Sequence, residues 1–142
     1  MRIFLPLFFA LPLFTAAQSA IDDAYALELL KRLEDDPRHA QYATDIQLLF
    51  RWLDESCDLV QYMNHPELNK IASRNRDYRE QMQILYLGGM LRYQKAHPDQ
   101  VANQSPLARQ EGSSCMCIGY ANLREKHKTK RDRYIKKLCR KK

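Results

Sequence analysis

The chain has 142 residues and carries 23 lysines and arginines against 17 aspartates and glutamates, so its formal net charge is +6. This length fits one domain with a modest hydrophobic core. The sequence contains no repeat with a period of about 20 to 50 residues, which excludes solenoids and propellers, and only its N-terminus is strongly apolar, which excludes a protein with several membrane spans.

Residues 1–20, MRIFLPLFFALPLFTAAQSA, predict a secretory signal peptide. Arg2 precedes an apolar run, and small residues follow at Ala17 and Ala20. The run is interrupted by two prolines and is too short to span a bilayer, which needs about 20 apolar residues. We therefore expect an exported protein, periplasmic if bacterial and secreted if eukaryotic. Its mature part, residues 21–142, is expected to be a single helical domain without a transmembrane segment.

The first half of the mature chain predicts two helices. One begins after Asp22 and Asp23, where carboxylates favour the positive end of a helix, and ends before Pro37. The other begins at Thr44 or Asp45. Its apolar face is expected to comprise Ile46, Leu49, Phe50, Leu53, Cys57 and Val60, with Trp52 at the edge of this face.

The next segment predicts a long central helix. Pro66 suits a first helical turn, and the residue before Pro98 is biased away from helix. We favour one helix over residues 66–95, although RNRD at 74–77 is the natural joint if there are two. Gly88 and Gly89 are predicted to let a neighbouring helix approach closely, and the helix bearing Cys57 is the candidate neighbour.

Two further helices are expected near the C-terminus. Ser105 and Pro106 form a cap and a first turn, and that helix should start there or near Ser113. Its face is expected to include Cys115, Ile118, Asn122 and Leu123, and a last helix should run from about Asp132 to Cys139. The fold class predicted is all-α, a small disulfide-stapled bundle of four or five helices.

All four cysteines, Cys57, Cys115, Cys117 and Cys139, are expected to form disulfides in an exported chain. A single straight helix over residues 115–139 would hold its ends roughly 36 Å apart. A chain reversal near Lys128 would instead bring Cys117 beside Cys139. This predicts one bridge from Cys117 to Cys139 and a second from Cys57 to Cys115, with free thiols as the alternative.

Few residues suggest chemistry. The Cys-Met-Cys triplet at 115–117 offers soft ligands for Cu(I) or a thiol-redox pair, but no second cysteine pair completes a metal site. A secreted hydrolase is a further alternative, because two carboxylates at a suitable separation can hydrolyse glycosides. The acidic candidates are Glu34, Asp35, Asp36, Asp54, Glu55 and Asp58. The four histidines stand alone and no catalytic motif is present. We predict no catalytic residue, no metal and no cofactor.

The strongest electrostatic signal is the basic C-terminal helix or tail, residues 124–142. Eleven basic residues against two acidic ones give 11 − 2 = +9, whereas residues 21–123 give 11 − 15 = −4. We predict a contact surface formed by Lys128, Lys130, Arg131, Arg133, Lys136 and Lys137. Two alternatives remain, because this helix also has a narrow apolar stripe formed by Tyr134, Ile135 and Leu138. The stripe could pack the helix against the rest of the domain, or it could make the helix membrane-active.

These observations favour an exported, non-enzymatic helical protein that binds another macromolecule, as an inhibitor, an immunity factor or an accessory subunit does. Its basic surface predicts an acidic protein or another anionic macromolecule as the partner. Nucleic acid is not expected for an exported chain.

Overall fold

The computed structural model describes residues 21–56, 65–74, 76–100 and 105–141, and within these ranges the chain is all-α, with no strand. The described residues form six helices, more than the four or five predicted. They are α1 (Asp23–Asp35), α2 (Tyr42–Glu55), α4 (Pro66–Ala72), α5 (Arg79–Ala96), α6 (Pro106–His127) and α7 (Arg133–Arg140).

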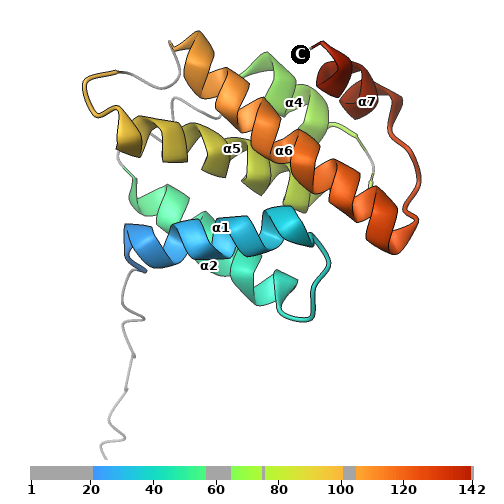
Figure 1. Cartoon of the computed structure of the whole chain (residues 1–142), viewed down its shortest axis with the longest axis horizontal. Coiled ribbons are helices and arrows are strands. Elements are labelled where there is room, and N and C mark those ends of the chain that lie inside the picture. The colour runs from blue at the N-terminus through green and yellow to red at the C-terminus, as the bar shows by residue number, and fades with distance from the viewer. Residues whose placement is uncertain (1–20, 57–64, 75, 101–104, 142) are drawn as a thin grey trace, which may run out of the picture.

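The helices surround α5 (Figure 1). α5 contacts α1, α2, α4 and α6, and its longest shared surface is with α6. α1 and α2 lie together on one side of the α5–α6 pair, and α7 lies on the other side. From Gln81 to Leu91 every residue of α5 except Gln83 is buried, because this helix is apolar on nearly all of its faces.

Several predicted helix ends are confirmed. Asp22 caps α1 by accepting a hydrogen bond from the Tyr25 amide at 2.7 Å. Ser105 caps α6, and Pro66 and Pro106 occupy the first turns of α4 and α6. α5 ends at Ala96, immediately before His97 and Pro98.

The prediction of one helix over residues 66–95 is wrong, because the chain leaves the helix after Ala72 and resumes at Arg79. The break lies at the joint that the sequence suggested. Arg74 and Arg76 lie in it, and both form ion pairs with Asp132, which precedes α7. The segment between α4 and α5 therefore contributes two side chains that bind the start of α7.

Two residues predicted for apolar faces are exposed instead. Phe50 of α2 is 38% exposed and Ile118 of α6 is 44% exposed. Trp52 is buried, and its indole N–H donates a hydrogen bond to Asp23 at 2.9 Å, which turns the ring toward α1. Cys57 and Val60 lie outside the described residues. Ile46, Leu49 and Leu53 are buried as predicted, so the buried face of α2 is shifted from Phe50 toward Trp52.

The two central glycines serve two different neighbours. A Cβ atom on Gly88 would lie 2.5 Å from Leu30 Cδ1 of α1. A Cβ atom on Gly89 would lie 2.8 Å from Cys115 Cβ and 2.8 Å from the Glu111 carbonyl oxygen, both on α6. The close approach is thus present, but the neighbour of Gly89 is α6 and not the helix that leads to Cys57. Gly112 of α6 faces α5 in the same way. A Cβ atom on Gly112 would lie 2.6 Å from the Tyr86 carbonyl oxygen.

We expect Gly89→Leu to lower the free energy of unfolding by about 1 to 3 kcal/mol, toward the upper end of that range. The reason is that two of the three nearest atoms belong to the backbone of α6 and cannot rotate away. Denaturant unfolding checks this, with Ala96→Leu at the exposed end of the same helix as the control. Equal stability of the two variants would contradict the close packing of α5 on α6.

None of the described helices combines the length and the apolar character that crossing a membrane requires.

Candidate functional site

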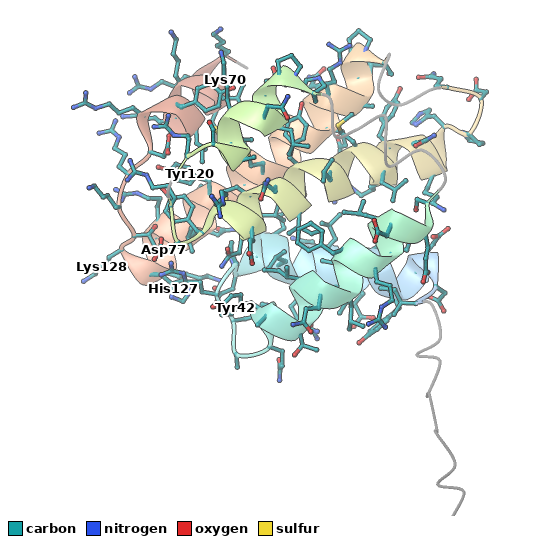
Figure 2. All side chains as sticks on the ribbon, turned by 180° about the vertical axis from the view of Figure 1, so that it is seen from behind. Tyr42, Lys70, Asp77, Tyr120, His127 and Lys128 are labelled. Carbon is teal, nitrogen blue, oxygen red and sulfur yellow. A yellow bond between two sulfur atoms is a disulfide. The ribbon has the colours of Figure 1, made fainter. Side chains whose placement is uncertain are left out.

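The candidate site is built where the chain reverses after α6. Lys128 adopts a left-handed conformation with φ of 49° and ends α6. Residues 129–132 then lead to α7, which contacts α6. Figure 2 shows Lys128 at this reversal, with nitrogen-tipped side chains projecting around α7. The predicted chain reversal near Lys128 is confirmed.

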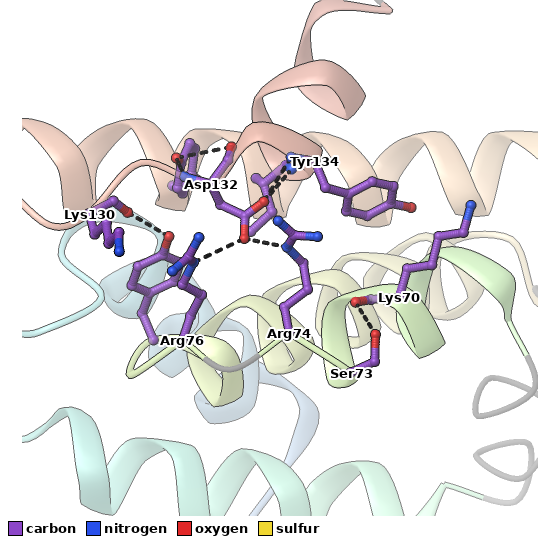
Figure 3. A network of polar contacts seen from close by, with 10 residues as sticks. Lys70, Ser73, Arg74, Arg76, Lys130, Asp132 and Tyr134 are labelled. Carbon is purple, nitrogen blue, oxygen red and sulfur yellow. Dashed lines mark hydrogen bonds and ion pairs between the residues drawn. The ribbon is translucent and has the colours of Figure 1, made fainter.

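Asp132 anchors the start of α7. One oxygen of its carboxylate accepts hydrogen bonds from the Tyr134 amide at 2.8 Å and the Ile135 amide at 3.1 Å, which caps the helix. The other oxygen forms ion pairs with Arg74 and, at 3.3 Å, with Arg76 (Figure 3). Asp132 is fully buried. A single carboxylate therefore joins α7 to the segment between α4 and α5.

These contacts set the charge of Asp132. Burial alone would raise the pKa of this carboxyl, but the ion pair with Arg74 and the backbone amides of Ile135 and Tyr134 outweigh burial. The pKa of Asp132 therefore lies below its ordinary value of 3.8. The group is a carboxylate at neutral pH, and both of its oxygens are engaged, one by the two backbone amides and the other by the two arginines.

Two buried tyrosines hold the segment that leads into α7. The Tyr78 hydroxyl donates to the Lys130 carbonyl at 2.7 Å, and the Tyr120 hydroxyl accepts from the Asp132 amide at 2.7 Å. On the outer side, Lys70 and Arg74 of the α4 region lie 5.6 and 5.7 Å from the centre of the Tyr134 ring. The approach to α7 is thus fixed by contacts with three other parts of the fold.

A disulfide fixes the other end of α7. Cys117 of α6 is bonded to Cys139, with 5.6 Å between their Cα atoms, as predicted. The helix of eight residues is therefore tied at its first turn by Asp132 and at its last turn by sulfur. Because both ends are held, the exposed side chains of α7 keep fixed positions relative to α6.

Two hollows lie along this tied helix. The first, of about 320 Å³, is lined by Arg131, Arg133, Lys136, Lys137 and Arg140. The second, of about 380 Å³, lies between α6 and α7 and is lined by Cys117, Tyr120, Ala121, Arg124, Arg131, Lys136, Cys139 and Arg140. Among the described residues, no carboxylate lines either hollow or forms an ion pair with these basic side chains. The site is one of concentrated positive charge.

The structure brings four of the six predicted contact residues together, namely Arg131, Arg133, Lys136 and Lys137. Lys128 and Lys130 are exposed on the preceding segment and line neither hollow. Arg124 and Arg140 were missed. Helical spacing could have indicated both, because Arg140 follows Lys136 by one turn and Arg124 follows Cys117 by two.

The Cys-Met-Cys triplet is not assembled as a ligand set. Cys117 is in the disulfide, whereas Cys115 is a free, fully buried thiol beneath Gly89. Residues two apart on a helix point in different directions, so these two cysteines face different neighbours. The predicted second bridge, from Cys57 to Cys115, is wrong because Cys115 is a free thiol. Cys57 lies outside the described residues. Met116 is also buried.

Cys115 lies in a polar pocket of the core. Burial raises the pKa of its thiol, and the neighbouring Glu34 raises it further. Arg92 forms ion pairs with Glu34 at 3.6 Å and with Glu111 at 2.7 Å. A protonated, buried thiol is a poor nucleophile, so this cluster has the features of a structural contact between α1, α5 and α6.

The carboxylates considered for hydrolysis are largely engaged elsewhere. Asp35 pairs with Lys31, and Asp36 contacts His127 at 2.6 Å. Asp54 and Glu55 are exposed at the end of α2, and Asp58 lies outside the described residues. Among the residues that the structure describes, no group of three or more histidine, cysteine or acidic side chains is placed to hold a metal ion.

Comparison with models of known protein families, with curated proteins and with solved structures finds no match for this chain.

Proposed function

We propose that this is an exported, non-enzymatic protein that binds an anionic macromolecule through α7 and the hollows beside it. In this proposal residues 1–20 are a signal peptide, residues 21–142 act as a single domain, and the protein serves as an inhibitor, an immunity factor or an accessory subunit. The observation that supports it best is the five lysines and arginines around one hollow of about 320 Å³ with no described carboxylate among them. Uncompensated charge of one sign attracts ligands of the opposite sign.

The way α7 is held supports the same proposal. Placing like charges close together costs free energy, and a helix tied at only one end could relieve that repulsion by moving away. Here Asp132 and the disulfide prevent such movement. A fixed cluster of cations loses little conformational entropy when a ligand binds, which favours affinity.

The other two functions predicted from the sequence gain no support from the described residues. A thiol-redox or soft-metal site would need Cys115 and Cys117 as neighbouring thiols, and they are separated into a buried thiol and a disulfide. A hydrolase would need a buried carboxyl group with a raised pKa. Asp35 and Asp36 pair with basic side chains, and Asp54 and Glu55 are exposed at the end of α2.

Charge reversal tests the proposal. We expect the triple variant Arg131→Glu, Arg133→Glu and Lys137→Glu to bind an immobilised anionic polymer at least about tenfold more weakly than the wild type at about 0.15 M salt. The polymers are polyglutamate, polyphosphate and a sulfated polysaccharide, each measured by surface plasmon resonance. These three side chains are exposed and form no ion pair with a described residue, so folding should be retained, and circular dichroism checks this.

The control reverses two charges instead of three on the opposite side of the molecule, with Lys31→Glu in α1 and Arg51→Glu in α2, and the effects are compared per reversed charge. We expect little change in binding for this control beyond the loss of overall charge. The proposal is wrong if none of the three polymers binds, or if the control weakens binding as much per charge as the α7 variant.

A further inference from the structure

The two hollows form a single basic groove, defined here by their combined lining residues. They share Arg131, Lys136 and Arg140, so they adjoin along α7. Six basic side chains border the groove, namely Arg124, Arg131, Arg133, Lys136, Lys137 and Arg140. An occupant that fills both adjoining hollows would present several negative charges to these six side chains.

Four of these six cations are arginines. A guanidinium is a planar fork of N–H donors that contacts two oxygens of one oxyanion at once, whereas an ammonium acts as a point charge. Tetrahedral oxyanions offer three outward oxygens per group and can be shared between neighbouring forks. The groove is accordingly better matched to sulfate or phosphate groups than to isolated carboxylates.

The part of the groove between α6 and α7 adds an apolar component. Ala121, the largely buried ring of Tyr120 and the Cys117–Cys139 disulfide line this part. None of these three groups carries charge, and together they can pack against C–H groups of a ligand. An inorganic phosphate chain has no such groups, whereas a sugar ring presents C–H groups on its faces and carries its sulfates at the edges.

We infer that the occupant of the basic groove is a segment of a sulfated polysaccharide, with its sugar rings over Ala121 and the disulfide and its sulfates between the arginines. This inference rests on the proposed function and specifies the chemical class of its ligand. An acidic protein would present a broad surface with carboxylates, and polyphosphate would leave the apolar part of the groove uncovered.

The test compares four probes by isothermal titration calorimetry with the full mature protein. They are a sulfated heparin hexasaccharide, the same hexasaccharide with its sulfates removed, a polyphosphate of equal charge, and polyglutamate of equal charge. We expect the sulfated hexasaccharide to bind about tenfold or more tightly than either charge-matched probe, and the desulfated one to show no binding. The double variant Arg131→Gln and Arg140→Gln should lose at least about tenfold in affinity for the hexasaccharide, and the control Lys31→Gln and Arg51→Gln should not.

A neutral substitution separates the apolar contribution from charge. Ala121 is exposed on α6, so Ala121→Leu should fold normally and occupy space in the groove. We expect it to weaken binding of the hexasaccharide more than binding of polyphosphate. If polyphosphate or polyglutamate binds as tightly as the hexasaccharide, or Ala121→Leu affects all probes equally, the inference is wrong and the proposed function stands. If no anionic probe binds, both are wrong.

Discussion

Asp132→Ala is expected to lower the free energy of unfolding by about 2.5 to 4 kcal/mol, the largest effect predicted for this protein. The lost helix cap contributes about 1 kcal/mol, and the lost hydrogen bonds between charged groups contribute about 1.5 to 3 kcal/mol. The change removes the cap of α7 and leaves Arg74 and Arg76 without their buried partner. Chemical denaturation monitored by circular dichroism measures this loss. A loss below about 1 kcal/mol, the size of a helix cap alone, would contradict the role of the ion pairs.

Asp132→Asn separates the contribution of the helix cap from that of the ion pairs. We also expect its effect to depend on pH. Asparagine still caps a helix, so this variant should lose only the part that depends on charge. Because the pKa of Asp132 lies below 3.8 in the folded protein, the stability from its charge is fully present above that pH. This stability is lost as the pH falls from 3.8 through the lower pKa that Asp132 has in the folded protein. The stability difference between wild type and Asp132→Asn should therefore be constant near neutral pH and shrink in acid.

Removing the disulfide is expected to have the second largest effect. The double variant Cys117→Ser and Cys139→Ser should be less stable by about 2 to 4 kcal/mol, because the bridge closes a loop between residues 22 apart in sequence. Thermal unfolding of the oxidised wild type and of the variant provides the measurement. The two serines should also loosen α7, which a drop in affinity for the anionic polymers would report.

Reduction supplies the control for this prediction. Treatment with a reductant should destabilise the wild type by a similar amount and leave the double-serine variant unchanged. Combining the serines with Asp132→Asn tests whether both links hold the same helix. If they do, the combined loss of stability should be smaller than the sum of the separate losses, because breaking one link already frees α7 and the second link then contributes little. Strict additivity would indicate that the two links act independently.

The helical plan of the chain could be predicted because its signals are local. Aspartates and Ser105 mark helix starts, prolines mark first turns and ends, and the reversal near Lys128 follows from the positions of Cys117 and Cys139. Whether residues 66–95 form one helix or two could not be decided in the same way. It depends on the pairing of Arg74 and Arg76 with Asp132, which is more than 50 residues away in sequence.

The direction of side chains was harder to predict than the helices. An apolar stripe says which residues share a face, but it does not say which neighbour that face meets. Phe50 and Ile118 lie on plausible stripes and are nevertheless exposed, while the faces of α5 are divided between α1 and α6 by two adjacent glycines. The partner of Gly89 depends on how α6 crosses α5, and no pattern within either helix specifies that.

In the candidate site, too, the sequence indicates the local features, whereas the features that depend on tertiary contacts could not be predicted. Charge segregation alone indicates the basic region, and four of the residues that it suggested, Arg131, Arg133, Lys136 and Lys137, line one hollow. Their role in binding stays a prediction. Arg124 joins them only because the disulfide brings α6 alongside α7. The apolar part of the groove is likewise a product of tertiary contact, since Tyr120 and Ala121 precede α7 by more than one turn of helix and a chain reversal.

The placement of α7 would also affect how quickly the proposed anionic partner is met. Residues 22–56, which contain α1 and α2, carry four basic and nine acidic side chains, or 4 − 9 = −5, and lie across the α5–α6 pair from α7 (Figure 1). Opposite charges at opposite sides give the molecule a large electric dipole. In the field of an anionic surface such a molecule rotates before it arrives, with α7 leading, and the association rate rises while the dissociation rate stays governed by short-range contacts.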